Sequence, residues 1–256
     1  MRGLDWQRAK WGGFARRVLQ FGEWAAATFP SATGVVSHTL EEHYARVHGK
    51  QVHCIPNAVE PAQRAPLERL PGLGFAGRDY LLFAGRISPE KGVDTLLRAI
   101  RPLGPLLGKR KLLIAGGSSF TDGYIEEMKA LAGPEVIFLG RVDRESMAEL
   151  YSHALAFILP SAMEGLSVAL LEAVSYGLPI VTTDIPENRE VVGEAALLFP
   201  YGDDRALSVH LRRLLEDEAF AAGLRAKAEA RAASLPGWDR VAELTEDFYL
   251  RVLGRR

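Results

Sequence analysis

Two glutamates, Glu164 and Glu172, bracket the short stretch EGLSVALLE. Within it Gly165 permits an unusual backbone angle and Ser167 is a suitable N-cap. We therefore expect a helix to begin here with free backbone N–H groups, which favour an anion such as phosphate. A carboxylate beside a phosphate is repelled, and its best neutral partners are paired hydroxyls such as those of a sugar. Two acids that flank a phosphate cradle indicate a sugar on each side of it, the chemistry of a nucleotide sugar.

The cations that a diphosphate needs lie in a second stretch, AGRISPEKGVD. Arg86 follows an apolar run, and Lys91 lies five residues later, at the mouth of the next expected helix. A lysine in the first turn of a helix opposes the helix dipole, so its presence there favours a bound anion nearby. Taken alone, Lys91 could equally be a solvated surface residue. Together with Arg86 and the acidic stretch, the anion-binding interpretation is favoured.

The elements that position these residues alternate between short β-rich runs and helical patterns from Tyr80 onward. The strand candidates are nearly continuous apolar runs, as expected when helices cover both faces of a sheet. They are YLLFAGR, KLLIAGG, EVIFLG, LAFILP and PIVTTD. The pattern predicts an α/β fold with a doubly wound parallel sheet, which binds ligands at the carboxyl ends of its strands. We expect these loops to share one rim: Gly85-Arg86, Gly116-Gly117, Gly140-Arg141 and Ser161 to Gly165.

The composition limits the classes of function. With 256 residues the chain can form one large α/β domain or two smaller ones, and its formal net charge of −1 provides no global field for nucleic acid. Cys54 is the only cysteine, which excludes an intrachain disulfide and fits a reducing compartment, so we expect a cytoplasmic location. The sequence has no apolar run of transmembrane length, and its N-terminus lacks the layout of a signal peptide.

Three longer segments carry a family resemblance: GRISPEKGVDTLLRA, FLGRVDRESMAELYSHALAFILPSAMEGLSVALLEAVSYGLPIVTTD and NREVVGEAALLF. In this order and spacing they resemble the family 4 retaining glycosyltransferases of the GT-B fold, over roughly residues 80 to 255. The paired acids, with seven residues between them, correspond to the E-x7-E motif of that family. The resemblance implies transfer of a sugar, with retention, from a nucleoside diphosphate sugar to a hydroxyl acceptor, in bacterial polysaccharide or cell-envelope glycan assembly.

The resemblance also implies a role for each site residue. Glu164 would face the donor sugar and Glu172 the ribose, while Arg86 and Lys91 would hold the diphosphate, so that no metal or other cofactor is required. The backbone around Arg141 would meet the base. The catalytic set is then Glu164, Arg86 and Lys91, and the donor-binding set comprises Gly85, Arg86, Lys91, Gly116, Arg141, Val142, Glu164, Gly165, Leu166, Ser167, Val168 and Glu172. Where the family usually has Gly-Phe-Gly after the first acid, this chain has Gly165-Leu166-Ser167.

We expect the chain to divide into three parts. Residues 1–75 resemble the later part of the family's N-terminal, acceptor-side domain with a linker, residues 76–236 form the donor-binding Rossmann-like domain, and residues 237–256 form a C-terminal crossover helix. Most of the acceptor domain is then missing, so the chain is expected to be either a fragment or a reduced protein. Asn57-Ala58 replaces the usual Asn-Gly turn, and Arg2 stands where relatives tend to have a histidine near the reacting centre.

Alternatives to an independent transferase stay open. One is a nucleotide-sugar-binding module without independent catalysis, and a lower-ranked one is a GT-B nucleotide-sugar epimerase. The expected partners are a nucleotide sugar and a glycan or lipid-linked acceptor. An aromatic series, Trp6, Trp11, Phe14, Phe21 and Trp24, is interleaved with basic residues, which fits a helix on the inner face of the membrane. Packing of that helix against other residues of the N-terminal domain is the preferred interpretation.

Two further patterns are set aside. His38, His43, His48 and His53 recur at every fifth residue. On a helix this step diverges by about 140° from one histidine to the next, so we expect surface histidines that do not share a face and no metal site. The stretch LIAGGSS lacks G-x-G-x-x-G, and the chain lacks a P-loop motif, which argues against a dinucleotide oxidoreductase and a P-loop NTPase.

Overall fold

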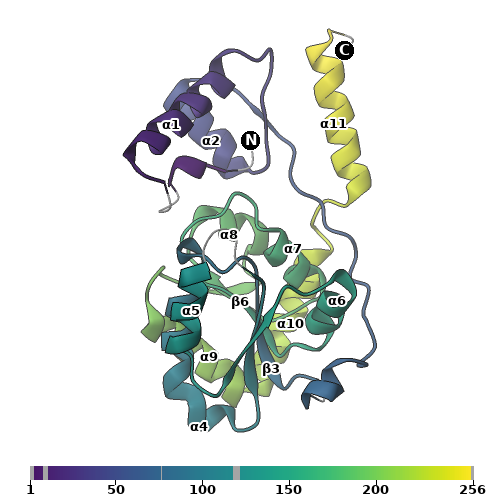
Figure 1. The fold of residues 1–256 in the computed structure, drawn as a ribbon. Helices are drawn as coiled ribbons and strands as arrows, with labels where there is room; N and C mark the ends of the chain where they lie inside the picture. The colour runs from purple at the N-terminus through teal and green to yellow at the C-terminus, as the bar shows by residue number, and fades with distance from the viewer. Residues whose placement is uncertain (1–2, 8–10, 76, 118–121, 255–256) are drawn as a thin grey trace.

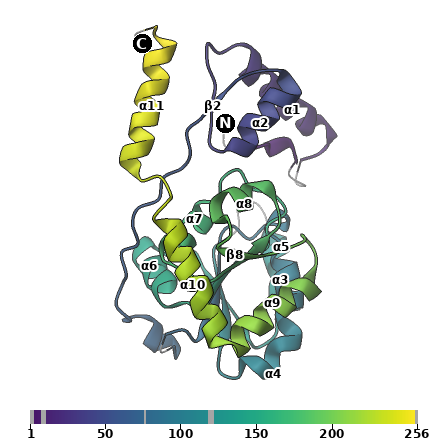
Figure 2. The same ribbon diagram turned by 180° about the vertical axis from the view of Figure 1, so that it is seen from behind.

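The structure, a computed structural model, describes residues 3–7, 11–75, 77–117 and 122–254. Figure 1 shows a small N-terminal unit, a larger α/β unit built on a six-stranded sheet, and a C-terminal helix, α11 (Trp238–Val252), that runs beside the N-terminal unit. Figure 2 shows the same arrangement from behind. The rings of His53 and Phe248 lie 5.3 Å apart, so α11 contacts the N-terminal unit directly.

The N-terminal unit has two helices and a pair of two-residue strands. Its elements are η1 (Asp5–Gln7), α1 (Gly13–Thr28), β1 (Gly34–Val35), α2 (His38–His48) and β2 (His53–Cys54). The strands pair in parallel, with Gly34 opposite His53. A small core of its own consists of Ala27, Val35, Leu40, Tyr44 and Val52. Each strand has only two residues, so the two helices make up most of this unit.

The α/β unit is built on one parallel sheet with the strand order β5-β4-β3-β6-β7-β8. The strands are β3 (Tyr80–Ala84), β4 (Lys111–Ala115), β5 (Val136–Gly140), β6 (Ala156–Leu159), β7 (Ile180–Thr183) and β8 (Ala196–Phe199). The four central strands are buried almost throughout. This confirms the doubly wound parallel sheet, and the strand order reverses between β3 and β6, where such sheets bind their ligands.

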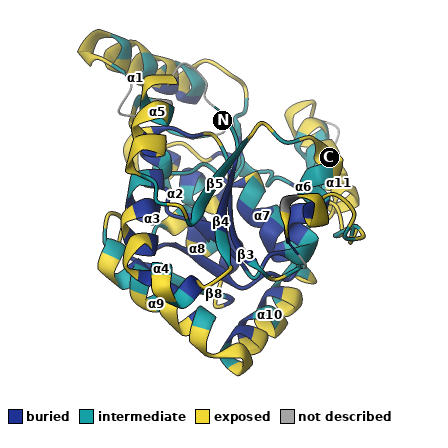
Figure 3. Ribbon diagram, turned by 60° about the horizontal axis from the view of Figure 1, so that its bottom comes forward, coloured by how far each residue is buried: buried dark blue, intermediate teal, exposed yellow. Residues whose placement is uncertain are grey.

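Helices cover both faces of the sheet, as Figure 3 shows by the dark buried strands between helices with exposed outer sides. Helix α3 packs against α5 and α9, and α7 packs against α8 and α10. The bounds are η3 (Pro89–Lys91), α3 (Val93–Ile100), η4 (Arg101–Leu103), α4 (Gly104–Leu107), α5 (Asp122–Leu131), α6 (Arg144–His153), α7 (Val168–Ser175), α8 (Pro186–Val192), α9 (Asp204–Glu216) and α10 (Glu218–Ala232). Strand β8 and helices α9 and α10 are elements that the sequence analysis did not predict.

The segment that joins the two units contains one short helix, η2 (Leu70–Leu73), and is anchored by Glu149 of α6. The Glu149 carboxylate accepts backbone N–H groups of Glu68, Arg69 and Leu70 at 2.8, 2.9 and 2.9 Å. Burial acts to raise the pKa of Glu149, but these hydrogen bonds outweigh it and hold the pKa below its usual range. A buried carboxylate therefore fixes the linker to the α/β unit.

Two glycines allow the loops at the carboxyl ends of the strands to approach one another. Gly92 has φ +66°, and a Cβ atom there would lie 2.1 Å from the carbonyl oxygen of Pro160, at the end of β6. Gly116 follows β4 with φ +145°, and its Cβ atom would lie 1.8 Å from the carbonyl oxygen of Gly85. Only glycine fits these contacts, which bring the loops after β3, β4 and β6 together.

Candidate functional site

The candidate site lies where β3 and β6 are neighbours and the strand order reverses. The loop after β3 carries Arg86 and continues into η3, which ends at Lys91. The loop after β6 carries Glu164 and leads into α7. The backbone N–H of Ala162 donates to the carbonyl of Glu90 at 2.8 Å, so the two loops are joined directly. The carboxyl ends of two central strands thus bring together residues that are far apart in sequence.

The central contact of this site is an ion pair between Lys91 and Glu164. The Lys91 Nζ atom lies 2.6 Å from Glu164 Oε1, and the two side chains are only 13% and 9% exposed. Removal of one partner from a pair that is shielded from water leaves the other charge poorly solvated. The site therefore carries a positive charge whose present partner is a carboxylate.

A small cavity of about 30 Å³ opens beside this ion pair. Four of the predicted site residues line it together: Arg86, Lys91, Glu164 and Gly165. Glu90 and Met163 also line it, and Gly3 and Leu4 contribute from the N-terminal unit, so the cavity lies between the two units. Arg86 is exposed, and its guanidinium group remains available to a ligand that enters from solvent. The sequence analysis predicted that the loops carrying Arg86 and Glu164 lie at one rim of the sheet, and the shared lining of this cavity is consistent with that prediction.

Helix α7 begins beside the ion pair. The Ser167 hydroxyl accepts the backbone N–H of Leu170 at 3.4 Å, so the predicted N-cap is present. Asn57 of the linker donates its side-chain amide to the carbonyl of Leu166 at 3.1 Å and thereby fastens the loop to the N-terminal side. Val168, the first helical residue, is 51% exposed. The start of the helix therefore faces an accessible space.

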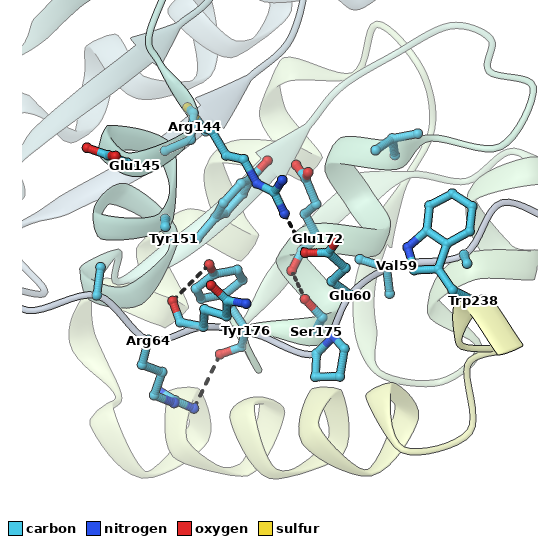
Figure 4. A pocket seen from close by; sticks show the side chains of 17 residues that line it. Val59, Glu60, Arg64, Arg144, Glu145, Tyr151, Glu172, Ser175, Tyr176 and Trp238 are labelled. Atoms are coloured by element: carbon cyan, nitrogen blue, oxygen red, sulfur yellow. Dashed lines mark hydrogen bonds and ion pairs between the residues drawn. The ribbon is translucent and has the colours of Figure 1, made fainter.

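Glu172 lies one turn further along α7 and lines a different, larger cavity of about 850 Å³. Figure 4 shows this cavity between α6, α7 and the linker, with Trp238 at its edge. Burial raises the pKa of Glu172, and this is only partly offset by a hydrogen bond with Tyr151 and by the charge of Arg144. Glu164, in the loop before α7, and Glu172, inside α7, thus line separate cavities.

Aromatic and charged side chains that the sequence analysis missed also line the larger cavity. The rings of Tyr151 and Tyr176 stack with centroids 5.3 Å apart, and Arg144 forms an ion pair with Glu60 of the linker (Figure 4). Tyr151 comes from α6, whereas Tyr176 follows α7. Their sequence positions gave no signal for this convergence, because it depends on how the two helices pack.

The remaining predicted donor-site residues lie at the neighbouring loops. Gly85 and Gly116 are in backbone contact, as described above. Arg141 and Val142 follow β5 and are exposed and half-buried, respectively, but they line neither of the two cavities. The Arg141 side chain lies against Gly117. A Cβ atom added at Gly117 would lie 3.0 Å from the Cγ atom of Arg141. The next residues along the chain that line the larger cavity are Arg144 and Glu145, at the start of α6.

The expectation for the histidines was wrong for one pair. His43 and His48 both point their Nε2 atoms at Glu23 Oε1, at 2.6 and 2.8 Å. The argument from helical spacing failed because His48 is the last residue of α2 and the acceptor comes from a different helix, α1. Glu23 lies between the two rings and is 6% exposed.

Two other expectations concern the N-terminal residues. Arg2, which stands in place of the family's histidine, lies outside the described residues. In α1, Phe14, Phe21 and Trp24 are 84, 62 and 43% exposed, so this helix presents an aromatic face. None of the helices that the structure describes is long and apolar enough to cross a bilayer.

The sequence is similar to a known protein family and to several curated proteins. The profile of the family described as "Glycosyl transferases group 1" matches residues 72–233. The O-antigen chain mannosyltransferase B of Escherichia coli is 30% identical over 193 residues, which cover 73% of this chain and 50% of that protein. The D-inositol 3-phosphate glycosyltransferase of a Nocardioides species is 34% identical over 189 residues, which cover 67% of this chain and 41% of that protein. The chain spans about half the length of the curated relatives it matches.

Solved structures share the fold at low sequence identity. The sucrose-phosphate synthase of Thermosynechococcus elongatus superposes with a TM-score of 0.82 at 24% identity, covering 99% of this chain and 66% of that one. The Anabaena protein HepE in complex with UDP and glucose superposes with a TM-score of 0.80 at 19% identity, covering 93% of this chain and 67% of that one. Both are similar in fold, and the fold is that of the GT-B glycosyltransferases.

Proposed function

The chain belongs to the group 1 glycosyl transferases, and from this we propose that it binds a nucleoside diphosphate sugar and transfers the sugar, with retention, to a hydroxyl acceptor. The proposed setting is bacterial polysaccharide or cell-envelope glycan assembly, as the name of the O-antigen mannosyltransferase relative suggests. The proposed location is the cytoplasm or the inner face of the membrane. The lone cysteine is consistent with a reducing compartment.

The observation that carries the proposal is the shielded ion pair between Lys91 and Glu164, with Arg86 beside the same cavity. In the proposed complex the diphosphate takes the place of the carboxylate as the partner of Lys91, and Arg86 provides a second positive charge. The start of α7 adds free backbone N–H groups, which favour the same anion. Glu164, released from the ammonium group, accepts hydroxyl groups of the donor sugar.

Catalysis in this proposal is chiefly electrostatic. When the bond between sugar and diphosphate breaks, negative charge grows on the departing phosphate oxygens. Arg86, Lys91 and the start of α7 are fixed close to that charge before the reaction, so they stabilise it with little rearrangement. The sugar becomes oxocarbenium-like. Hydrogen bonds from its hydroxyl groups to Glu164 hold the sugar in position for attack by the acceptor hydroxyl. Attack on the same face as the departing diphosphate retains the configuration.

The nucleoside part of the donor belongs, in this proposal, near the larger cavity. Glu172 lines this cavity and is proposed to accept both hydroxyls of a ribose. The backbone around Arg141 and Val142, in the loop after β5, is proposed to meet the base. The cavity of about 850 Å³ falls within the range of small-molecule sites. The complex of the HepE neighbour contains UDP, so UDP is the first nucleotide to test on this chain.

The three-part division of the chain is also part of the proposal. We assign residues 1–75 to the acceptor side and its linker, 76–236 to the donor side, and 237–256 to the crossover helix. The acceptor is proposed to be a glycan or a lipid-linked sugar that approaches from the N-terminal unit. Contact of the exposed aromatic face of α1 with a membrane would serve a lipid-linked acceptor.

The experiment that tests the function measures binding and turnover separately. Thermal shift with UDP, GDP and dTDP sugars identifies the donor, because a ligand that binds the folded state raises the melting temperature. Hydrolysis or transfer of the selected donor by the same chain then reports catalysis. Binding without turnover would favour a nucleotide-sugar-binding module, and a product that is an epimerised nucleotide sugar would contradict the transferase. Absence of any selective binding would contradict the donor site itself.

A further inference from the structure

The N-terminal unit contains a buried carboxylate that is surrounded by nitrogen atoms. Glu23 of α1 is 6% exposed. Its Oε1 atom accepts from His43 Nε2 at 2.6 Å and from His48 Nε2 at 2.8 Å, and its Oε2 atom accepts the indole N–H of Trp6. Both histidines come from α2, and Figure 1 shows α1 and α2 side by side. The cluster therefore joins the two helices of this unit.

The buried carboxylate of this cluster has no strongly basic partner among the residues that the structure describes. Its two oxygen atoms accept from His43, His48 and Trp6. The ion pairs of Glu23 involve the two histidines and no lysine or arginine. A carboxylate in such a poorly solvated place favours a cation as its partner.

Tyr44 provides a second and independent observation. Its side chain is fully buried, and its hydroxyl has no hydrogen-bond partner among the residues that the structure describes. A buried hydroxyl without a partner is unfavourable, and in native proteins it usually indicates a ligand or a water molecule. Tyr44 lies on α2 beside His43, and the rings of Tyr44 and His48 are 5.4 Å apart.

We propose that Glu23, His43 and His48 bind one Zn²⁺ ion, with a water molecule as the fourth ligand that hydrogen-bonds to the Tyr44 hydroxyl. Two imidazoles and one carboxylate form a donor set that zinc accepts, with an open position for water. The three ligand atoms lie within 4.8 Å of one another. Tetrahedral ligands at Zn–N and Zn–O distances of about 2.0 to 2.2 Å are roughly 3.3 Å apart, so the two distances from Glu23 to the histidine nitrogens, now 2.6 and 2.8 Å, must each lengthen by about half an ångström or slightly more.

The protons and the neighbouring groups fit this assignment. Each imidazole must present a bare Nε2 atom to the metal, so a neutral ring moves its proton to Nδ1 and a charged ring releases one proton to solvent. The Trp6 N–H already holds the second oxygen of Glu23, as outer partners of metal ligands commonly do. The role is structural: the ion links α1 to α2 in the unit that lines one side of the donor cavity.

The test uses the whole chain after treatment with a chelator. We expect the wild type to bind one equivalent of Zn²⁺ in competition with a chromophoric chelator and to melt at a higher temperature when Zn²⁺ is present. His43→Ala and His48→Ala should each weaken binding more than about 100-fold, since even outer partners of a metal contribute about 10- to 100-fold. The matched controls are His38→Ala and Cys54→Ser, because His38, Cys54 and Glu190 form a second cluster of candidate ligands in the described part of the chain. These two variants should bind as the wild type does.

A measurement on the wild type alone guards against variants that fail to fold. Co²⁺ in the proposed site has nitrogen and oxygen ligands, so its visible spectrum should show tetrahedral bands without the intense near-ultraviolet absorption of a cobalt–thiolate bond. A thiolate band would place the ion at Cys54 and overturn the proposal. Failure of the wild type to bind one equivalent of Zn²⁺, or equal affinity in the His43→Ala, His48→Ala double variant, would also overturn it.

Discussion

The Lys91 ammonium and the Glu164 carboxylate meet at 2.6 Å, although 73 residues separate them in sequence. They meet because β3 and β6 are neighbours in the sheet and Gly92 allows the loop after β3 to touch the end of β6. The two side chains are almost hidden from water. In the proposed complex a donor diphosphate competes with Glu164 for Lys91, so we expect binding and transfer to respond differently to substitution.

Glu164→Gln separates binding of the nucleotide from transfer of the sugar. The substitution removes a carboxylate that repels the diphosphate and frees Lys91, so we expect UDP to bind several-fold more tightly. Transfer from the donor should fall by roughly 100-fold, the order of effect seen when one preorganised polar contact at a reacting centre is lost. Isothermal titration with UDP and a transfer assay measure the two quantities.

The control for this variant is Glu187→Gln. Glu187 is half-buried and close enough to Glu164 for that charge to contribute to its raised pKa, but burial is the larger cause. It has no ion pair with Lys91 among the described residues. Its substitution should change UDP affinity less than Glu164→Gln does. If the affinity of Glu164→Gln for UDP falls together with its transfer rate, Glu164 supports the phosphate site and the proposed competition is wrong.

Glu172→Gln should make the protein more stable while weakening its affinity for nucleoside diphosphates. The substitution removes a charge that burial disfavours, and we expect the melting temperature without ligand to rise by about 2 °C at neutral pH. The ribose loses a charged acceptor, so affinity should fall by about 10- to 100-fold. Ser175→Ala is the control, because the Ser175 hydroxyl donates to the backbone carbonyl of Glu172 at 2.9 Å and leaves its carboxylate unchanged.

The same residue predicts a dependence on pH. The pKa of Glu172 is higher in the folded than in the unfolded state, so the folded state binds the proton more tightly. Glu172 therefore contributes fully to the free energy of unfolding at pH values below its pKa in the unfolded state, near 4.5. This contribution is lost as the pH rises through the pKa of Glu172 in the folded state. Nucleotide affinity should rise over that window, because the ionised carboxylate is the acceptor. Identical pH profiles for wild type and Glu172→Gln would contradict this role.

Gly92→Ala should disrupt the loop that carries Lys91. The residue has φ +66°, and its Cβ atom would lie 2.1 Å from the Pro160 carbonyl oxygen, so either the loop or the end of β6 must move. We expect a loss of about 3 kcal/mol in the free energy of unfolding, measured by denaturant titration. Gly123→Ala is the matched control, since Gly123 lies in α5 with no atom within 4 Å of the added Cβ. A Gly92→Ala variant as stable as the Gly123→Ala control would refute the close approach.

The sheet could be predicted because its signal is local. Runs such as YLLFAGR and LAFILP are apolar throughout, and helices on both faces of a sheet require such strands. The position of Arg86, Lys91 and Glu164 at one rim followed from the rule that parallel strands end together. The sequence analysis did not identify β8, α9 and α10, although Leu207, Leu211 and Leu214 form an apolar helical stripe that could have indicated α9.

Other features depend on packing between distant segments. The pairing of Arg144 with Glu60 requires the linker to run past α6, and the convergence of His43 and His48 requires Glu23 to enter from α1. Spacing along one helix cannot report a partner that comes from another. The anchor of the linker on Glu149 is of the same kind, because a carboxylate that accepts three backbone N–H groups has no local pattern.

The most direct test of the donor site is the affinity of the chain for a nucleoside diphosphate, compared between wild type, Arg86→Ala and Lys91→Ala. Both residues line the cavity beside Glu164, and each supplies a positive charge that the diphosphate is proposed to meet. Isothermal titration with the nucleotide selected by thermal shift should show that each variant binds this nucleotide more than about tenfold more weakly than the wild type does. A loss of this size is expected when a charge-assisted hydrogen bond is removed. Unchanged affinity in both variants would contradict the assignment of this rim as the diphosphate site.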